Sequence, residues 1–176
     1  YNIDYDDSTI SKALSLVGLE NFENRDIYSL SGGQKQRLAL AGILCVNPDI
    51  IILCGQAASR SKISIETKAR NVLGRSIDES DEITSNIIVE DGPTAYFSKF
   101  PTVEALSHLL HNDIPVELSN NAGEYICNAL YYQVMHYYPD IETVFIHFPL
   151  YKNQVDNKGI DLDILIKGLE KIIESL

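Results

Sequence analysis

The sequence lacks tryptophan and has only one methionine, three cysteines and no long hydrophobic run. Cys45, Cys54 and Cys127 are too few and too scattered for a secreted disulfide scaffold or a zinc site, so we expect no metal. The longest strongly apolar run, residues 50–54, is far too short to cross a membrane. No signal peptide is recognisable at the N-terminus, so we expect a cytoplasmic protein without membrane insertion.

Basic residues are also scarce, with 14 Lys and Arg against 25 Asp and Glu, and the net charge is −11. This balance argues against nucleic acid and anionic membranes as partners, because both bind basic surfaces. The acidity is spread along the chain, as is typical of a solvated protein surface. The 176 residues allow one domain or two small ones.

Helical and extended patterns alternate along the sequence. Helical periodicity covers residues 8–17, 34–46, 103–110, 125–138 and 162–176, whereas compact extended runs occupy residues 49–53, 66–73, 115–119 and 143–148. The polar, acidic residues 77–92 indicate a surface excursion. This alternation predicts an α/β protein with a mostly parallel sheet.

The first motif with chemical meaning is Ser31-Gly32-Gly33-Gln34, which opens a predicted helix. The backbone N–H groups and the dipole at a helix start favour an anion, and the two glycines would let a phosphate approach closely. Two glycines before a helix are, however, more often only a loop.

The longer run YSLSGGQKQRLALA at residues 28–41, followed by NPDIIIL at 47–53, resembles the signature region of ABC-transporter ATPases. It is most similar to those of energy-coupling-factor transporters, and the resemblance covers residues 1–53. It implies that residues 31–34 contact the γ-phosphate of a nucleotide held by a partner, so ATP would bind only in trans. The chain has no Walker A motif, and Cys54-Gly55 replaces the family's Asp-Glu pair, so we expect no ATP hydrolysis.

The second constellation is Cys127 near the start of a predicted helix and His147 near the end of a predicted strand. A helix N-terminus stabilises a thiolate, which predicts a lowered pKa for the Cys127 thiol. A nucleophilic cysteine needs a base, and that base needs a third group to orient it. On composition alone, both residues would more often be packing residues.

The surrounding sequence resembles the pyroglutamyl peptidase I (pyrrolidone-carboxylate peptidase) family. PVELSNNAGEYICN at residues 115–128 resembles its cysteine motif, and FIHFP at 145–149 is similar to its histidine motif. Residues 55–71 resemble the segment that carries the catalytic glutamate, and residues 91–97 resemble a further family segment. The resemblance runs from about residue 48 to the C-terminus. It implies a three-layer α/β/α sandwich that lacks the family's N-terminal part.

The resemblance also implies a Cys-His-Glu triad. Cys127 would be the nucleophile, His147 would move the proton, and Glu66 would orient the imidazole. The implied reaction removes an N-terminal pyroglutamate from a peptide, through a thioester that water then hydrolyses. The resemblance implies that no metal or organic cofactor takes part.

Four further residues correspond to substrate-binding positions of that family. Gln56 matches a position that lines the lactam pocket, and Tyr125 and Ile126 would supply its apolar wall. Arg75 would contribute to the oxyanion site, although it follows Asn71 by four residues where the family has five. The oligomeric state is left open, a homo-oligomer included.

The two resemblances meet at residues 48–52, because PDIII fits both families. We infer an apparent chimera, with an ABC signature fragment over residues 1–47 and a peptidase-like domain over residues 48–176. Recombination, an engineered fusion and an error in assembling the source sequence each explain such a junction, and sequencing across residues 47–54 distinguishes them. The chain starts at Tyr1 and not at Met, so we expect something upstream to be missing.

The leading hypothesis is therefore a cysteine peptidase impaired by truncation, and the alternative is a fragment of an ABC-transporter ATP-binding subunit. Because the chain has no Walker A motif, we expect the isolated protein not to bind ATP in a nucleotide titration. Saturable binding in the micromolar range would favour the ABC alternative. An intact ABC subunit serves as the positive control.

Overall fold

The computed structural model describes residues 6–46, 48–74, 87–154 and 159–176. The chain divides into two compact units, Tyr1–Asp49 and Ile50–Leu176. Of the stretch 77–92, expected as a surface excursion, most lies outside the described residues. None of the described helices is long and apolar enough to cross a membrane.

The first unit is helical. It contains α1 (Asp7–Leu16), a short 3-10 helix η1 (Ile27–Ser29) and α2 (Gly32–Cys45), and α1 packs against α2. Arg37 Nη1 donates hydrogen bonds of 3.2 Å to the carbonyl oxygens of Val17 and Gly18, which follow the last residue of α1. The buried apolar residues described in this unit are Ala13, Leu14, Val17, Leu19, Leu30, Ala41 and Leu44.

The second unit is built on a four-stranded sheet, in the order β1 (Ile50–Gln56), β6 (Glu142–Phe148), β2 (Ile63–Glu66) and β5 (Val116–Ser119). The pairs β1–β6 and β2–β5 are parallel, and β2–β6 is antiparallel. The mostly parallel sheet expected from the sequence is therefore confirmed, with one antiparallel pairing at its centre.

A strand over residues 66–73 was expected, and the structure confirms this only in part. Strand β2 ends at Glu66, and after Thr67 the separate strand β3 (Lys68–Arg70) pairs antiparallel with β4 (Ala95–Phe97). The break falls where Thr67 N donates a 2.7 Å hydrogen bond to Ser119 O at the end of β5. Strand β4 was not expected, since a strand of only three residues shows no clear alternation.

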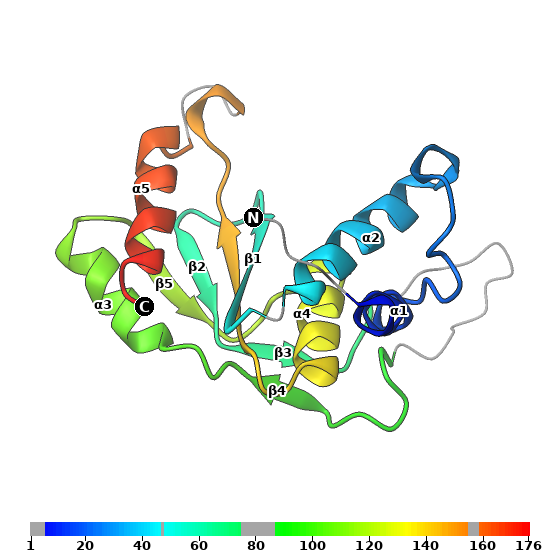
Figure 1. Cartoon of the computed structure of the whole chain (residues 1–176). Coiled ribbons are helices and arrows are strands. Elements are labelled where there is room, and N and C mark those ends of the chain that lie inside the picture. The colour runs from blue at the N-terminus through cyan, green and yellow to red at the C-terminus, as the bar shows by residue number, and fades with distance from the viewer. Residues whose placement is uncertain (1–5, 47, 75–86, 155–158) are drawn as a thin grey trace, which may run out of the picture. The chain divides into compact units, whose positions relative to one another are not determined.

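Helices cover both faces of the sheet (Figure 1). Helices α3 (Thr102–His111) and α5 (Leu162–Ile173) share an apolar core with one face. Helix α4 (Ile126–Tyr137) packs on the other face and also contacts β3 and β4. The three-layer α/β/α arrangement is thus confirmed. A second 3-10 helix, η2 (Lys152–Gln154), follows β6.

The alternation of side chains along β2 and β6 decides what each face holds. The face toward α3 and α5 is apolar at these strands and contains Ile63, Ile65, Val144 and Ile146, each 0% exposed. The alternate positions on the face toward α4 are Ser64 and Glu66 of β2 and Phe145 and His147 of β6. The titratable side chains of these two strands, Glu66 and His147, therefore lie on the α4 face of the sheet.

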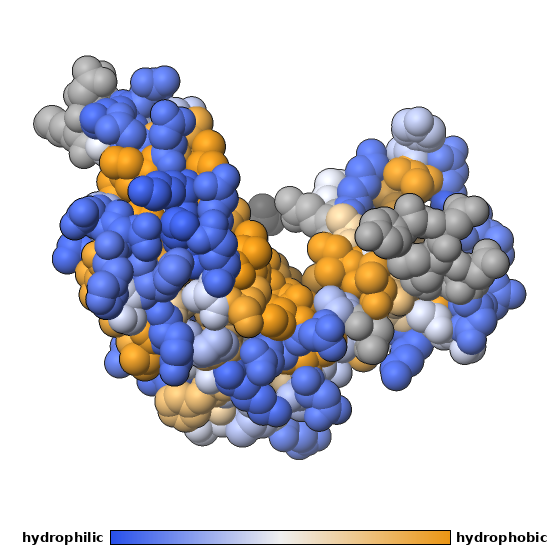
Figure 2. Space-filling view, turned by 60° about the vertical axis from the view of Figure 1, so that its left-hand side comes forward, coloured by the Kyte–Doolittle hydropathy of each residue, from blue (hydrophilic) through white to orange (hydrophobic). Residues whose placement is uncertain are grey.

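The surface of α3 and α5 is mainly hydrophilic. Figure 2 shows blue side chains over most of this region, with apolar residues between them. On α5, Leu165 and Ile172 are buried, whereas Leu162, Ile166 and Ile173 are about half exposed. The apolar stripe of this helix is consequently wider than the core it covers.

Gly55 near the end of β1 permits a close approach of side chains on the α4 face. A Cβ at this position would lie 2.9 Å from Phe145 Cζ and 3.3 Å from Cys127 Sγ. Since real Cβ atoms essentially never come within 3.0 Å of another heavy atom, a larger residue would displace the Phe145 ring.

We expect Gly55→Ala to destabilise the protein by roughly 1–3 kcal/mol, because overpacking a closely packed interior costs about this much. The matched control is Gly42→Ala in α2, where an added Cβ has nothing within 4 Å. That change should stabilise the protein by about 0.5–1 kcal/mol, since alanine is the better helix former. Urea unfolding followed by circular dichroism measures both, and equal midpoints would contradict the close-approach argument.

Candidate active site

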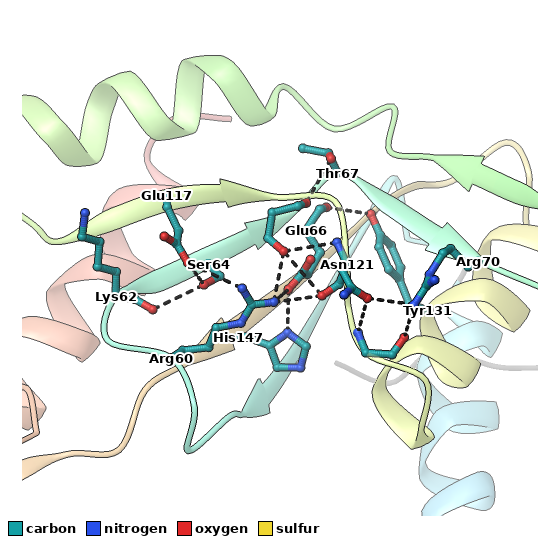
Figure 3. A network of polar contacts seen from close by, with 12 residues as sticks. Arg60, Lys62, Ser64, Glu66, Thr67, Arg70, Glu117, Asn121, Tyr131 and His147 are labelled. Carbon is teal, nitrogen blue, oxygen red and sulfur yellow. Dashed lines mark hydrogen bonds and ion pairs between the residues drawn. The ribbon is translucent and has the colours of Figure 1, made fainter. Parts of the chain in front are cut away.

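The site begins with a buried acid beside a buried imidazole. Glu66 is the last residue of β2, His147 is the penultimate residue of β6, and their side chains are 0% and 6% exposed. His147 Nδ1 lies 2.8 Å from Glu66 Oε1 (Figure 3). With its proton on Nδ1, the ring donates to the carboxylate and leaves Nε2 as a proton acceptor. The arrangement is that of an oriented general base.

Glu66 has further partners. Arg60 Nη2 donates to the same Oε1 at 3.0 Å, and Tyr131 Oη donates to the backbone oxygen of Glu66 at 3.0 Å. Glu66 Oε2 is buried and has no hydrogen-bond partner among the described residues. A buried carboxylate needs such compensation, because removing a charge from water is costly.

Cys127 is half-buried and lies in the first turn of α4, on the same face of the sheet as this pair. Its Sγ is adjacent to Gly55, and Gly55 is paired in register with His147. In the described part of the chain, no hydrogen bond joins Cys127 to His147. The structure thus gathers Cys127, His147 and Glu66 on one face, with the thiol not yet bonded to the base.

Asn128 fixes the start of α4, and sequence reasoning assigned it no role. Its side chain accepts from Arg70 N at 2.9 Å and donates to Arg70 O and Val72 O, each at 2.8 Å. Asn128 is 0% exposed, so these bonds satisfy its whole amide within the protein. The residue next to Cys127 is therefore anchored to β3.

The predicted lowering of the Cys127 pKa is wrong. Burial raises the pKa of the Cys127 thiol, and the negative charge of Glu66 raises it further, which outweighs a backbone hydrogen bond that lowers it. Burial, with a smaller contribution from Glu66, also raises the pKa of Tyr131 to about 12. Cys127 is thus a neutral thiol at neutral pH, and its use as a nucleophile depends on a base.

The predicted pocket residues differ in whether their side chains are available to a ligand. Tyr125 and Ile126 directly precede Cys127 and are 72% and 79% exposed, so both are free to contact a ligand. The Gln56 side chain instead forms a reciprocal amide pair with Gln154, with N–O distances of 2.8 and 3.2 Å. Gln56 directly follows Gly55 in β1, so the two residues face opposite sides of the sheet. Arg75 lies outside the described residues.

The signature-like residues of the first unit form the start of α2. Gln34 N donates to Ser31 Oγ at 3.3 Å and Ser31 N donates to Gln34 Oε1 at 2.9 Å, which makes a capping box around Gly32 and Gly33. Where the chain is described, no group of three or more His, Cys, Asp or Glu side chains could hold a metal ion.

Two family models match the chain. The model for pyroglutamyl peptidase matches residues 33–176, and a model for ABC transporters matches residues 2–54. The two matches overlap over residues 33–54. The peptidase match therefore begins earlier than the expected junction at residue 48.

Individual relatives agree with the first of these models. The pyrrolidone-carboxylate peptidase of Finegoldia magna is 38% identical over 141 residues, which cover 74% of this chain and 66% of that protein. That of Thermosipho melanesiensis is 41% identical over 133 residues, covering 70% and 66%. The chain thus spans slightly less than two thirds of the length of these relatives.

Solved structures give the same result. A mutant pyrrolidone carboxyl peptidase from the hyperthermophile Pyrococcus furiosus superposes with a TM-score of 0.70 at 30% identity, covering 82% of this chain and 76% of that one. The pyroglutamyl peptidase I from Bacillus amyloliquefaciens gives a TM-score of 0.68 at 28% identity, covering 81% and 72%.

The raised pKa of Cys127 predicts slow alkylation near neutral pH. In a variant with Cys45→Ser and Cys54→Ser, we expect the rate with iodoacetamide to keep rising above pH 9, because only the thiolate reacts. The same protein unfolded in urea is the control, and its rate should level off around the ordinary cysteine pKa of about 8.5. A plateau below pH 8 in the folded protein would contradict the assignment.

Proposed function

The chain belongs to the pyroglutamyl peptidase family, and on this premise we propose that it is a cysteine peptidase that removes N-terminal pyroglutamate from peptides. The observation that carries the proposal is the buried Glu66–His147 pair, with Cys127 beside it on the α4 face of the sheet. These are the three groups that a thiol nucleophile, its base and an orienting acid require.

In the proposed reaction, Cys127 Sγ attacks the carbonyl carbon that follows the pyroglutamyl ring, and its proton passes to His147 Nε2. The tetrahedral intermediate collapses to a thioester when His147 returns that proton to the leaving amine. Water then attacks the thioester carbonyl as His147 takes one of its protons. The C–S bond breaks, free pyroglutamate leaves, and His147 returns the proton to the sulfur, which regenerates the thiol. Glu66 holds the imidazole in the required tautomer and stabilises its positive charge. The raised pKa of Cys127 makes the base necessary.

For the substrate pocket, we propose that the exposed Tyr125 and Ile126 form the apolar wall against the lactam ring. Gln56 would contribute to this pocket only if its amide leaves Gln154, because both of its polar atoms are paired. Arg75 is kept as the candidate for the oxyanion site. No metal or organic cofactor enters the reaction.

For the first unit, we propose an ABC signature fragment of the energy-coupling-factor type, joined to the peptidase-like part near residue 48. The match of an ABC model to residues 2–54 and the capped Gly32-Gly33 helix start support this reading. Such a fragment would contact ATP only in trans, on a partner that carries the nucleotide. We further propose a cytoplasmic location and leave the oligomeric state open, a homo-oligomer included.

We expect the chain to cleave pyroglutamyl-aminomethylcoumarin far more slowly than a full-length relative, because ABC-like residues stand where the peptidases have their first segment. Cys127→Ala should abolish the residual turnover, since it removes the nucleophile, whereas the matched change Cys45→Ala in α2 should not alter it. Release of the fluorophore is the measurement. A rate equal to that of the relative, lost in Cys127→Ala, would disprove the impairment and keep the peptidase. Turnover that survives Cys127→Ala would disprove the peptidase assignment.

A further inference from the structure

We propose that Arg60 is a positioning residue for this site: it holds the Glu66 carboxylate in its orientation toward His147, and it ties that carboxylate to the turn before Cys127. The proposal rests on the proposed function in so far as it assigns His147 the role of a base. The contacts of Arg60 that support it do not depend on which peptide is cleaved.

Three segments meet at one nitrogen of Arg60 (Figure 3). Nη2 lies 3.0 Å from Glu66 Oε1 in β2, 3.0 Å from Ser119 Oγ at the end of β5, and 2.9 Å from the backbone oxygen of Asn121. Asn121 belongs to the turn that leads into α4 and Cys127. Arg60 itself is held near β1, since its backbone N–H donates to Ala57 O at 3.0 Å.

Arg60 and His147 share a single oxygen of Glu66. Nδ1 of the ring and Nη2 of the guanidinium both approach Oε1, at 2.8 and 3.0 Å, while Oε2 has no partner in the described part of the protein. The rotation of the carboxylate is therefore set by these two donors together. Without Arg60, only the imidazole would hold it.

The groups that face the Glu66–His147 pair differ in charge. Glu66 is faced by His147 from β6, by Cys127 and Tyr131 from α4, and by Arg60 from the loop after β1. Arg60 Nη1 also lies 3.6 Å from Glu117 Oε1 in β5. Among the described residues that contact Glu66, Arg60 is the one permanent cation, and it serves two carboxylates.

Removing this cation would leave the carboxylates of Glu66 and Glu117 without the counter-charge that Arg60 supplies. The negative charge of Glu66 already raises the pKa of the Cys127 thiol, and without Arg60 it would act on the sulfur uncompensated. The thiol would then keep its proton to higher pH, and the imidazole alone would hold the carboxylate in place. A cationic side chain at position 60 thus favours both the deprotonation of Cys127 and the orientation of Glu66 toward His147.

The test compares Arg60→Met, Arg60→Lys and Arg70→Met in the variant that keeps only Cys127. Arg70 Nη2 binds Asn121 Oδ1 at 2.9 Å and Glu124 Oε1 at 3.3 Å, so it supports the same turn without contacting Glu66. The readouts are the pH profile of Cys127 alkylation by iodoacetamide and the pH profile of pyroglutamyl-aminomethylcoumarin turnover. Circular dichroism at each pH verifies that each variant is folded.

We expect Arg60→Met to move both profiles to higher pH by about one unit, which is roughly a tenfold loss of rate on the acid side. Arg60→Lys, which keeps the charge, should have midpoints close to those of the parent, and Arg70→Met should leave the midpoints unchanged. Equal shifts in Arg60→Met and Arg70→Met, or no shift in either, would overturn the proposal.

The two readouts separate this inference from the proposed function. A shifted alkylation profile in Arg60→Met, with no turnover in any variant, supports the role of Arg60 and contradicts the peptidase activity. Turnover by the parent, with no shift of the alkylation profile in Arg60→Met, supports the peptidase activity and contradicts the role of Arg60. If Arg60→Met does not fold, Arg60→Lys against Arg60→Gln provides the same comparison of charge with size.

Discussion

The main constraint on the second unit is the free-energy cost of burying the Glu66 carboxylate. Glu66 is fully enclosed, and a charge in that position is stable only where donors surround it. Two groups reach the carboxylate, the imidazole of β6 and the guanidinium of the loop after β1, while the hydroxyl of Tyr131 donates to the backbone oxygen of Glu66. Meeting this requirement brings the middle of the sheet, α4 and the turn before Cys127 into one polar network.

Burial also explains the protonation state of Cys127, the proposed nucleophile. A helix N-terminus lowers a thiol pKa, but at Cys127 partial burial and the facing carboxylate outweigh it. The site therefore combines a buried carboxyl group with a thiol that stays neutral at rest. This combination suits a mechanism in which the proton leaves the sulfur only as the substrate carbonyl is attacked, with the imidazole as its acceptor.

Much of this could be predicted from the sequence, and the failures have identifiable causes. Long periodic segments such as α5 and compact β-branched runs such as β6 were found, because pattern alone specifies them. The break between β2 and β3 was missed, since it is set by the pairing of Thr67 with Ser119 across 52 residues. The pairing of Gln56 with Gln154 and the convergence on Arg60 were likewise invisible, because such contacts exist only once distant segments meet. Motif similarity found the three triad candidates, and it could not supply the sign of the Cys127 pKa shift.

The antiparallel pairing of β2 with β6 has a consequence for how the chain folds. Glu66 and His147 are 81 residues apart, and Cys127 lies on a third segment between them. Contacts of such long range form late, because the entropy of closing a long loop must be overcome before they stabilise anything. A nascent or partly folded chain would thus expose the edge of β2 until β6 pairs with it. Glu66 is, for that interval, part of a strand with an unpaired edge that is open to aggregation.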